Sequence, residues 1–321
     1  MQFRTQIAIQ KTKSPIDYHS KMVLIGSCFA ESMAQKFDYF KFQNIANPFG
    51  IMFNAISIEN IIDRIANNKL FAEKDIFFQN DAWHCFEVHS CLSHPDKNIF
   101  IDQLNLILLQ TSSYFSMATH FIFTFGTSWV YRNILNNQVV ANCHKMAQSH
   151  FNKELISIDA TQKSIENIIL LILSINAKAK FIFTISPVRH IKDGFFENNV
   201  SKGILQQAFF IVLHSQELQS ARNTLEIFPS YEIIMDELRD YRFFEADMLH
   251  PNQIAIDYVW QQFVLSNVNS NTQYLLKKVE AIQKMLGHRS INFNADATKK
   301  LSEKIQIDMQ LLNNSNPEII F

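Results

Sequence analysis

The sequence predicts an α/β protein built on a doubly wound parallel sheet, and two observations support this prediction. Short continuous apolar runs at residues 22–25, 120–125 and 180–185 are typical of strands buried on both faces. Between them lie longer segments in which apolar residues recur every three or four positions, as in amphipathic helices. Strands that alternate with such helices form open parallel sheets, whose ligand crevice lies at the carboxyl ends of the strands.

The same patterns predict the remaining elements in order. Helices are expected at residues 29–40, 51–68, 104–120, 164–175, 202–222, 251–263, 272–286 and 296–312. Shorter strands are expected at residues 3–10, 225–228 and 231–235.

Two stretches depart from the alternation of strand and helix. Residues 76–93 contain short alternating runs around a polar turn, which predicts an inserted β-hairpin. Beyond about residue 266 the sequence becomes charged and amphipathic. We therefore expect one domain over residues 1–265 and a C-terminal helical extension over residues 266–321.

Composition restricts the class of ligand. The 321 residues are 47% hydrophobic, which is enough for a full core, and the net charge is −1 with both signs mixed. This mixture argues against nucleic acid as a partner. No apolar run is long enough to enter a membrane, and the first residues lack the apolar core of a secretion signal, so we expect a cytoplasmic protein. The four cysteines lack C-x-x-C spacing, so we expect free thiols. Three histidines and two cysteines interleave at residues 84–94, but their spacing suits no metal site, so we expect hairpin residues there, no metal and no cofactor.

The stretch from Lys21 to Ala34 has the pattern of a strand, a turn and a helix. An apolar run breaks at Gly26, and Ser27 and Cys28 follow where a helical pattern begins. The free N–H groups and the dipole of a helix N-terminus favour negative charge, so a nucleophile here has a catalytic geometry. Locally, however, a serine in this position also suits a simple helix cap.

A second motif lies near the end of the predicted domain, where Asp247 and His250 form a D-x-x-H pattern on a turn. This spacing lets the carboxylate hold the imidazole Nδ1, so that Nε2 faces outward as a general base. The alternative interpretation is a surface acid and an unrelated histidine before a helix.

Residues 26–30 read Gly-Ser-Cys-Phe-Ala, and this chain resembles the GSCFA family, which is similar to the SGNH or GDSL-type esterase superfamily. The resemblance covers residues 3–265, and its further blocks stand in order at residues 47–50, 125–131, 142–145, 186–190 and 247–250. It implies a three-layer α/β/α hydrolase fold of flavodoxin-like type. It also implies a catalytic triad of Ser27, His250 and Asp247, which passes through an acyl-enzyme.

The resemblance further implies an oxyanion hole made from the N–H of Ser27, a glycine represented by Gly50, and an asparagine of a third block. In this chain Gly126 is followed by Thr127 and Ser128, where the asparagine is expected. One lost donor costs about 3 to 4 kcal/mol of transition-state stabilisation. The replacement donor is therefore sought among three residues, Asn54, Thr127 and Ser128.

Two residues of this chain can be aligned with the nucleophile of the superfamily. Superfamily members usually read Gly-Asp-Ser, and an alignment on Gly26 places Cys28 at the nucleophile. A cysteine at a helix N-terminus opposite a histidine is expected to have a lowered pKa. We favour Ser27, because the resemblance is to a serine hydrolase family, and keep Cys28 as its rival.

Several polar and aromatic residues follow the predicted strands and hairpins, and are expected to face the crevice. Arg189 suits a bidentate contact with a substrate carboxylate or phosphate, or else a structural ion pair with Asp193. The substrate-binding set expected from these positions is His89, Trp129, His144, Arg189 and His190.

We expect a carboxyl-ester hydrolase or acyltransferase that acts on an acylated small molecule or carbohydrate. The alternatives are a catalytically lapsed ligand-binding module and a scaffold. Either the scaffold or a homo-oligomer would form through the C-terminal helices.

Overall fold

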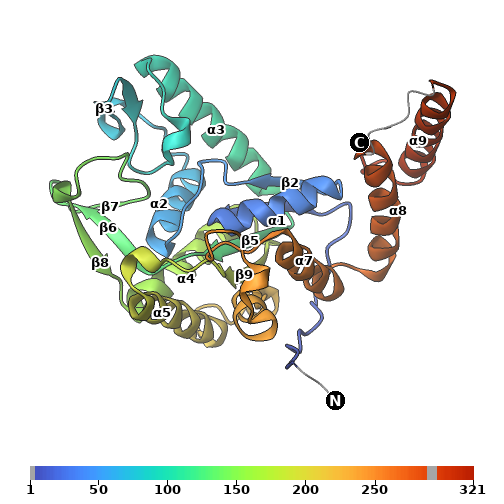
Figure 1. The fold of residues 1–321 in the computed structure, drawn as a ribbon. Coiled ribbons are helices and arrows are strands. Elements are labelled where there is room, and N and C mark those ends of the chain that lie inside the picture. The colour runs from blue at the N-terminus through green and yellow to red at the C-terminus, as the bar shows by residue number, and fades with distance from the viewer. Residues whose placement is uncertain (1–3, 288–294) are drawn as a thin grey trace.

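The computed structural model describes residues 4–287 and 295–321, and its centre is a parallel sheet of five strands. The strand order is β10-β9-β5-β1-β2, and all four neighbouring pairs are parallel (Figure 1). The strands are β1 (Lys21–Gly26), β2 (Gln43–Ala46), β5 (His120–Phe125), β9 (Lys180–Ile185) and β10 (Leu225–Ile227). This order is flavodoxin-like and changes direction between β1 and β5, where open α/β sheets bind ligands.

Helices cover both faces of the sheet, which confirms the predicted three-layer α/β/α fold (Figure 1). One face packs on α2 (Ala55–Ala66), α3 (Lys97–Met117), α4 (Ile158–Ile175) and α5 (Phe195–His214). The other face packs on α1 (Cys28–Tyr39), α7 (Gln253–Asn267) and α8 (Ser270–Gly287).

The strands have continuous apolar runs because each strand contributes side chains to two hydrophobic cores, one on each face of the sheet. In β1, Val23 and Ile25 pack into the first core, whereas Met22 and Leu24 pack into the second. Successive side chains of a strand point to opposite faces, so a strand covered on both sides needs apolar residues at every position.

Two small antiparallel sheets flank the central one, on the side away from α8 (Figure 1). The first is the hairpin of β3 (Phe77–Gln79) and β4 (Ala82–His84), which lies within residues 76–93. The second has the order β7-β6-β8, formed by β7 (Val139–Val140), β6 (Trp129–Asn133) and β8 (Phe151–Leu155).

Two predicted strands are wrong. Residues 231–235 are helical, because α6 (Ser230–Glu232) continues into a π-helical turn at Ile233–Leu238 that buries Ile233 and Ile234 in the second core. Residues 4–10 pair with no strand in the described chain; instead Ile7 N–H donates to Glu237 Oε2 at 3.1 Å. Residue 3 of that prediction lies outside the described residues.

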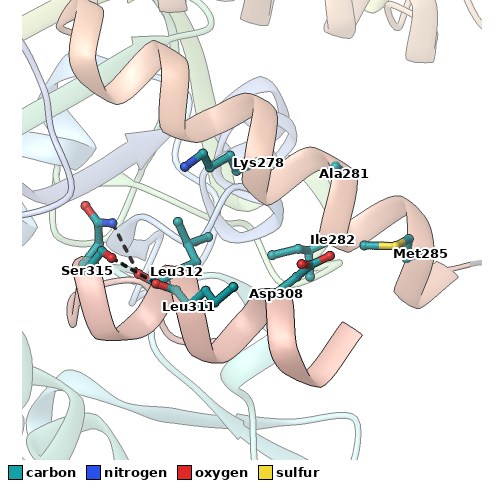
Figure 2. A pocket seen from close by; sticks show the side chains of 9 residues that line it. Lys278, Ala281, Ile282, Met285, Asp308, Leu311, Leu312 and Ser315 are labelled. Carbon is teal, nitrogen blue, oxygen red and sulfur yellow. Dashed lines mark hydrogen bonds between the residues drawn. The ribbon is translucent and has the colours of Figure 1, made fainter. Parts of the chain in front are cut away.

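The C-terminal helices α8 and α9 (Ala295–Ser315) pack together and enclose a groove of about 430 Å³ (Figure 2). The groove is lined by Lys278, Ala281, Ile282, Met285, Asp308, Leu311, Leu312, Ser315 and Asn316. It contains no residue predicted for the catalytic site. Among the helices of the described chain, none is both long and apolar enough to cross a membrane.

Candidate active site

The turn from β1 to α1 is fixed against the neighbouring strand β5. Gly26 has a φ of +148°, and a Cβ on it would lie 2.1 Å from the Thr124 carbonyl oxygen. That carbonyl accepts a hydrogen bond from Ser27 N–H at 3.0 Å. Ser27 is 1% exposed, and its Oγ caps α1 by accepting from Phe29 N–H at 3.3 Å. The oxyanion role needs the Ser27 N–H and the nucleophile role needs its hydroxyl. Both groups are therefore already used in hydrogen bonds of this turn.

Cys28 is the first residue of α1 and is more exposed than Ser27. Within the described chain, the Cys28 N–H donates to no acceptor except the sulfur of its own side chain. Burial raises the pKa of the Cys28 thiol, and the nearby Glu31 carboxylate raises it further, although the N–H groups of Phe29 and Cys28 and the charge of Lys202 oppose them. The expected lowering of the pKa is wrong in sign. At neutral pH the group is a thiol, so it needs a general base to act as a nucleophile.

Replacing Glu31 with glutamine tests this electrostatic balance. Loss of the carboxylate lowers the pKa of the Cys28 thiol, so alkylation of Cys28 by iodoacetamide at pH 8 should become faster by about threefold. Peptide mass spectrometry of timed samples measures the rate, and Glu217→Gln, on the surface beyond α5, is the matched control. An unchanged or slower rate in Glu31→Gln would contradict the assignment.

The structure brings Asp247 and His250 together. Asp247 Oδ2 lies 2.6 Å from His250 Nδ1, and Asp247 Oδ1 accepts from the N–H groups of His250 and Leu249 at 3.0 and 2.8 Å. The backbone N–H and the ring of His250, followed by the Leu249 N–H, lower the pKa of Asp247 to about 2. Asp247 is therefore charged at working pH and holds the proton on Nδ1, which leaves Nε2 as the basic nitrogen.

Arg189 holds the turn that carries this pair. Its Nη2 donates to the Met248 carbonyl at 2.8 Å, and its guanidinium stacks on the rings of Tyr241 and Phe244 at 5.5 and 5.2 Å. The alternative partner, Asp193, instead pairs with a lysine. Arg189 thus contacts the turn of the predicted base, and its Nη2 is already used there.

Most of the predicted oxyanion donors already have acceptors. Gly50 N–H donates to Asn47 O at 2.7 Å, and the N–H groups of Gly126 and Thr127 donate to Phe53 O at 2.7 and 3.1 Å. The Ser128 hydroxyl donates to the Ser201 carbonyl at 3.0 Å, and the Thr127 hydroxyl pairs with the Ser201 hydroxyl at 2.9 Å.

Asn54 is different from these residues. Its Oδ1 caps α2 by accepting from Ser57 N–H at 2.8 Å, and its Nδ2 has no acceptor within the described chain. The segment before it crosses the carboxyl ends of two strands, because Met52 N–H donates to Gly26 O and Phe53 O accepts from Gly126. The side-chain amide of Asn54 is therefore a free donor close to the end of β1.

His190 follows β9 and packs against Gly126. Its Nε2 is buried without a partner in the described chain and lies 3.2 Å from the position of a Cβ on Gly126. Burial, then the charge of Lys202, lowers the pKa of His190 to about 4. The Asp193 carboxylate opposes this lowering of the His190 pKa, whereas the charge of His250 adds to it.

Three other predicted substrate-binding residues have structural contacts. His144 is buried beside the β3–β4 hairpin, and its Nε2 lies 2.7 Å from Cys85 O. The Trp129 indole donates to Glu197 O at 3.4 Å. His89 packs against Gly50, where a Cβ would lie 2.2 Å from the His89 Cβ.

Sequence reasoning missed Lys202, which is 1% exposed and lies among these groups. Its Nζ donates to the carbonyls of Gly126 and Ser186 at 2.6 and 2.7 Å. A signal was present, since Lys202 falls on the apolar face of α5, one turn before Leu205 and two before Phe209. The predicted helix begins at residue 202, whereas α5 begins at Phe195, so Lys202 lies inside the helix and not at its start.

Comparison with known proteins gives one family. The sequence profile of the GSCFA family matches residues 21–263. None of the curated proteins compared with the chain matches it. Among solved structures, the chain is similar to the crystal structure of a carbohydrate esterase family 3 from Talaromyces cellulolyticus, at 10% identity and a TM-score of 0.32, covering 82% of this chain and 99% of that chain.

Proposed function

We propose that this chain, which belongs to the GSCFA family, is an SGNH-like acyl-ester hydrolase or acyltransferase that uses the Cys28 thiol as its nucleophile. The proposal is supported by two segments that follow carboxyl ends of the sheet strands: Cys28 with its free N–H comes after β1, and Arg189 in the loop after β9 holds the turn of the Asp247–His250 pair. This edge at the change in strand direction is where open α/β sheets bind ligands. The substrate class proposed is an acylated small molecule or carbohydrate.

In the proposed reaction each of these groups has one role. His250 Nε2 takes the thiol proton as Cys28 Sγ attacks the carbonyl carbon, a C–S bond forms, and the carbonyl electron pair moves to oxygen. The oxyanion accepts from Cys28 N–H and Asn54 Nδ2. When it collapses, the C–O bond breaks and His250 returns the proton to the leaving alcohol. Water or a second alcohol then attacks the thioester by the same route.

The choice of Cys28 over Ser27, the residue favoured by sequence, rests on what each group already contacts. The Ser27 N–H and hydroxyl serve the β1–α1 turn, and the side chain is almost fully buried. Cys28 is more exposed, and its N–H is unoccupied within the described chain. A nucleophile whose own N–H faces the oxyanion matches the arrangement that the family resemblance implies.

Acylation by p-nitrophenyl acetate tests the proposal. The wild-type protein should acquire one acetyl group on Cys28, seen by peptide mass spectrometry, and Cys28→Ala should lose it. Ser27→Ala should still be acylated, with lower stability of about 1 kcal/mol from the lost cap. Acylation that persists in Cys28→Ala and disappears in Ser27→Ala would move the role to Ser27. Failure of the wild type to react with a panel of acyl esters would favour the ligand-binding alternative.

The other sequence predictions continue as proposals. Free thiols at all four cysteines support a cytoplasmic location, since disulfides are rare there. Exposed apolar residues on α9, Ile307 and Leu311, support self-association through residues 266–321.

A further inference from the structure

We propose that Lys202 is the internal counter-ion for negative charge that develops at Cys28, acting as a positioning residue beneath the site. The inference deepens the proposed function and rests on it. It starts from the contacts of Lys202, which no predicted role uses.

Lys202 is an unusual residue for a protein interior. Its whole side chain is buried, and within the described residues its two hydrogen bonds go to backbone carbonyls and not to a carboxylate. Lysine is rarely buried without a charged partner, because removing an ammonium from water costs several kcal/mol. An uncharged donor could make the same hydrogen bonds with a smaller desolvation cost, so a structural role alone does not require a lysine.

The two acceptors of Lys202 place its charge at the carboxyl edge of the sheet. Gly126 and Ser186, whose carbonyls it holds, directly follow β5 and β9. In the sheet, Gly26 is the register partner of Thr124, so Cys28 and Gly126 both lie two residues beyond paired positions on neighbouring strands. Lys202 thus sits beneath the same edge that carries Cys28.

The ionisable groups around Cys28 and Lys202 come from different segments of the chain. The charge of Lys202 lowers the pKa of the Cys28 thiol, whereas Glu31 on α1 raises it. On the loop after β9, His190 is kept neutral by burial and by Lys202. From α6, the ring of Tyr231 lies 5.7 Å from Lys202 Nζ. Asp193 and His250 also act on His190, and Arg189 acts on Tyr231, so Lys202 is the fully buried cation among these groups.

The protonation of Lys202 is coupled to that of Cys28. Burial lowers the pKa of Lys202 to about 7, and the negative charge of Cys28 raises it. An ammonium has three N–H donors, and two have acceptors in the described chain. When Cys28 becomes anionic, the ammonium form is favoured and screens the new charge. The thiol proton itself still passes to His250, so Lys202 neither gains nor loses a proton in the covalent step.

Replacing Lys202 with glutamine separates its charge from its hydrogen bonds. The glutamine amide has two N–H donors for the two carbonyls but no charge, whereas Lys202→Met removes both. In each variant the pKa of the Cys28 thiol should rise, so that alkylation by iodoacetamide at pH 6.5, where Lys202 is charged, falls about twofold and its pH profile moves to higher pH. Lys163→Gln, at an exposed position on α4, is the control and should match the wild type.

The readouts distinguish this inference from the proposed function. Alkylation forms no oxyanion and needs no ester substrate, so it reports on charge at Cys28 alone. A wild-type alkylation profile in folded Lys202→Gln overturns the inference, even where acylation of the wild type stands. A shifted profile without any acylation of the wild type supports the counter-ion role and overturns the esterase proposal.

A second measurement keeps Lys202 in place, so it does not require a Lys202 variant to fold. In protein labelled with 13C-lysine, the Cε resonance of Lys202 reports its titration. The midpoint should move to higher pH in Cys28→Asp, because a carboxylate at this position is charged at the pH where Lys202 titrates and favours its ammonium form. An identical midpoint in Cys28→Asp and wild type would overturn the inference.

Discussion

Replacing His250 with alanine is expected to slow acylation of Cys28 by about 10⁴-fold at pH 7. The thiol has a raised pKa and is protonated at this pH, so attack needs a base to remove its proton. His250 Nε2 is the basic nitrogen of the Asp247–His250 pair. The burst of p-nitrophenol in a stopped-flow experiment measures the acylation rate directly.

The defect in His250→Ala should shrink as the pH rises. The thiolate forms without a base only at alkaline pH, so acylation in the variant should increase up to and beyond pH 9. His214→Ala, at an exposed position on α5, is the control and should keep the wild-type burst. A full burst in His250→Ala at pH 7 would show that another group takes the proton.

The predicted fold was most accurate where burial dictates sequence. Residues 120–125 and 180–185 coincide with β5 and β9, because strands covered on both faces must be apolar throughout. The strand β2 was missed, since Gln43–Ala46 is half-buried at the sheet edge and has no apolar run. Residues 231–235 were misassigned because a short apolar run can serve a strand or a buried helical turn equally well.

The candidate site was predictable where its parts are local in sequence. The β1–α1 turn and the Asp247–His250 pair each lie within a few residues, so spacing alone indicates them. Lys202 could not be assigned in this way, because its contact with Gly126 joins residues 76 positions apart. The burial that raises the pKa of Cys28 likewise depends on packing between distant segments.

Gly26→Ala is expected to reduce the free energy of unfolding by about 3 kcal/mol or more. The φ of +148° is one that L-residues rarely adopt, and the new Cβ would meet the Thr124 carbonyl oxygen at 2.1 Å. That oxygen belongs to the β5 backbone and accepts from Ser27 N–H, so it cannot retreat without breaking the strand pairing that positions Cys28. Urea unfolding followed by circular dichroism measures the loss.

Gly203→Ala is the matched control, because it makes the same chemical change where the backbone permits it. Gly203 lies inside α5, and a Cβ there meets nothing within 4 Å. Alanine is the better helix former, so this variant should gain about 0.5 to 1 kcal/mol. If Gly26→Ala instead unfolded like the wild type, the β1–α1 turn would have to tolerate a different backbone. The position of Cys28 would then no longer follow from the contact between Gly26 and Thr124.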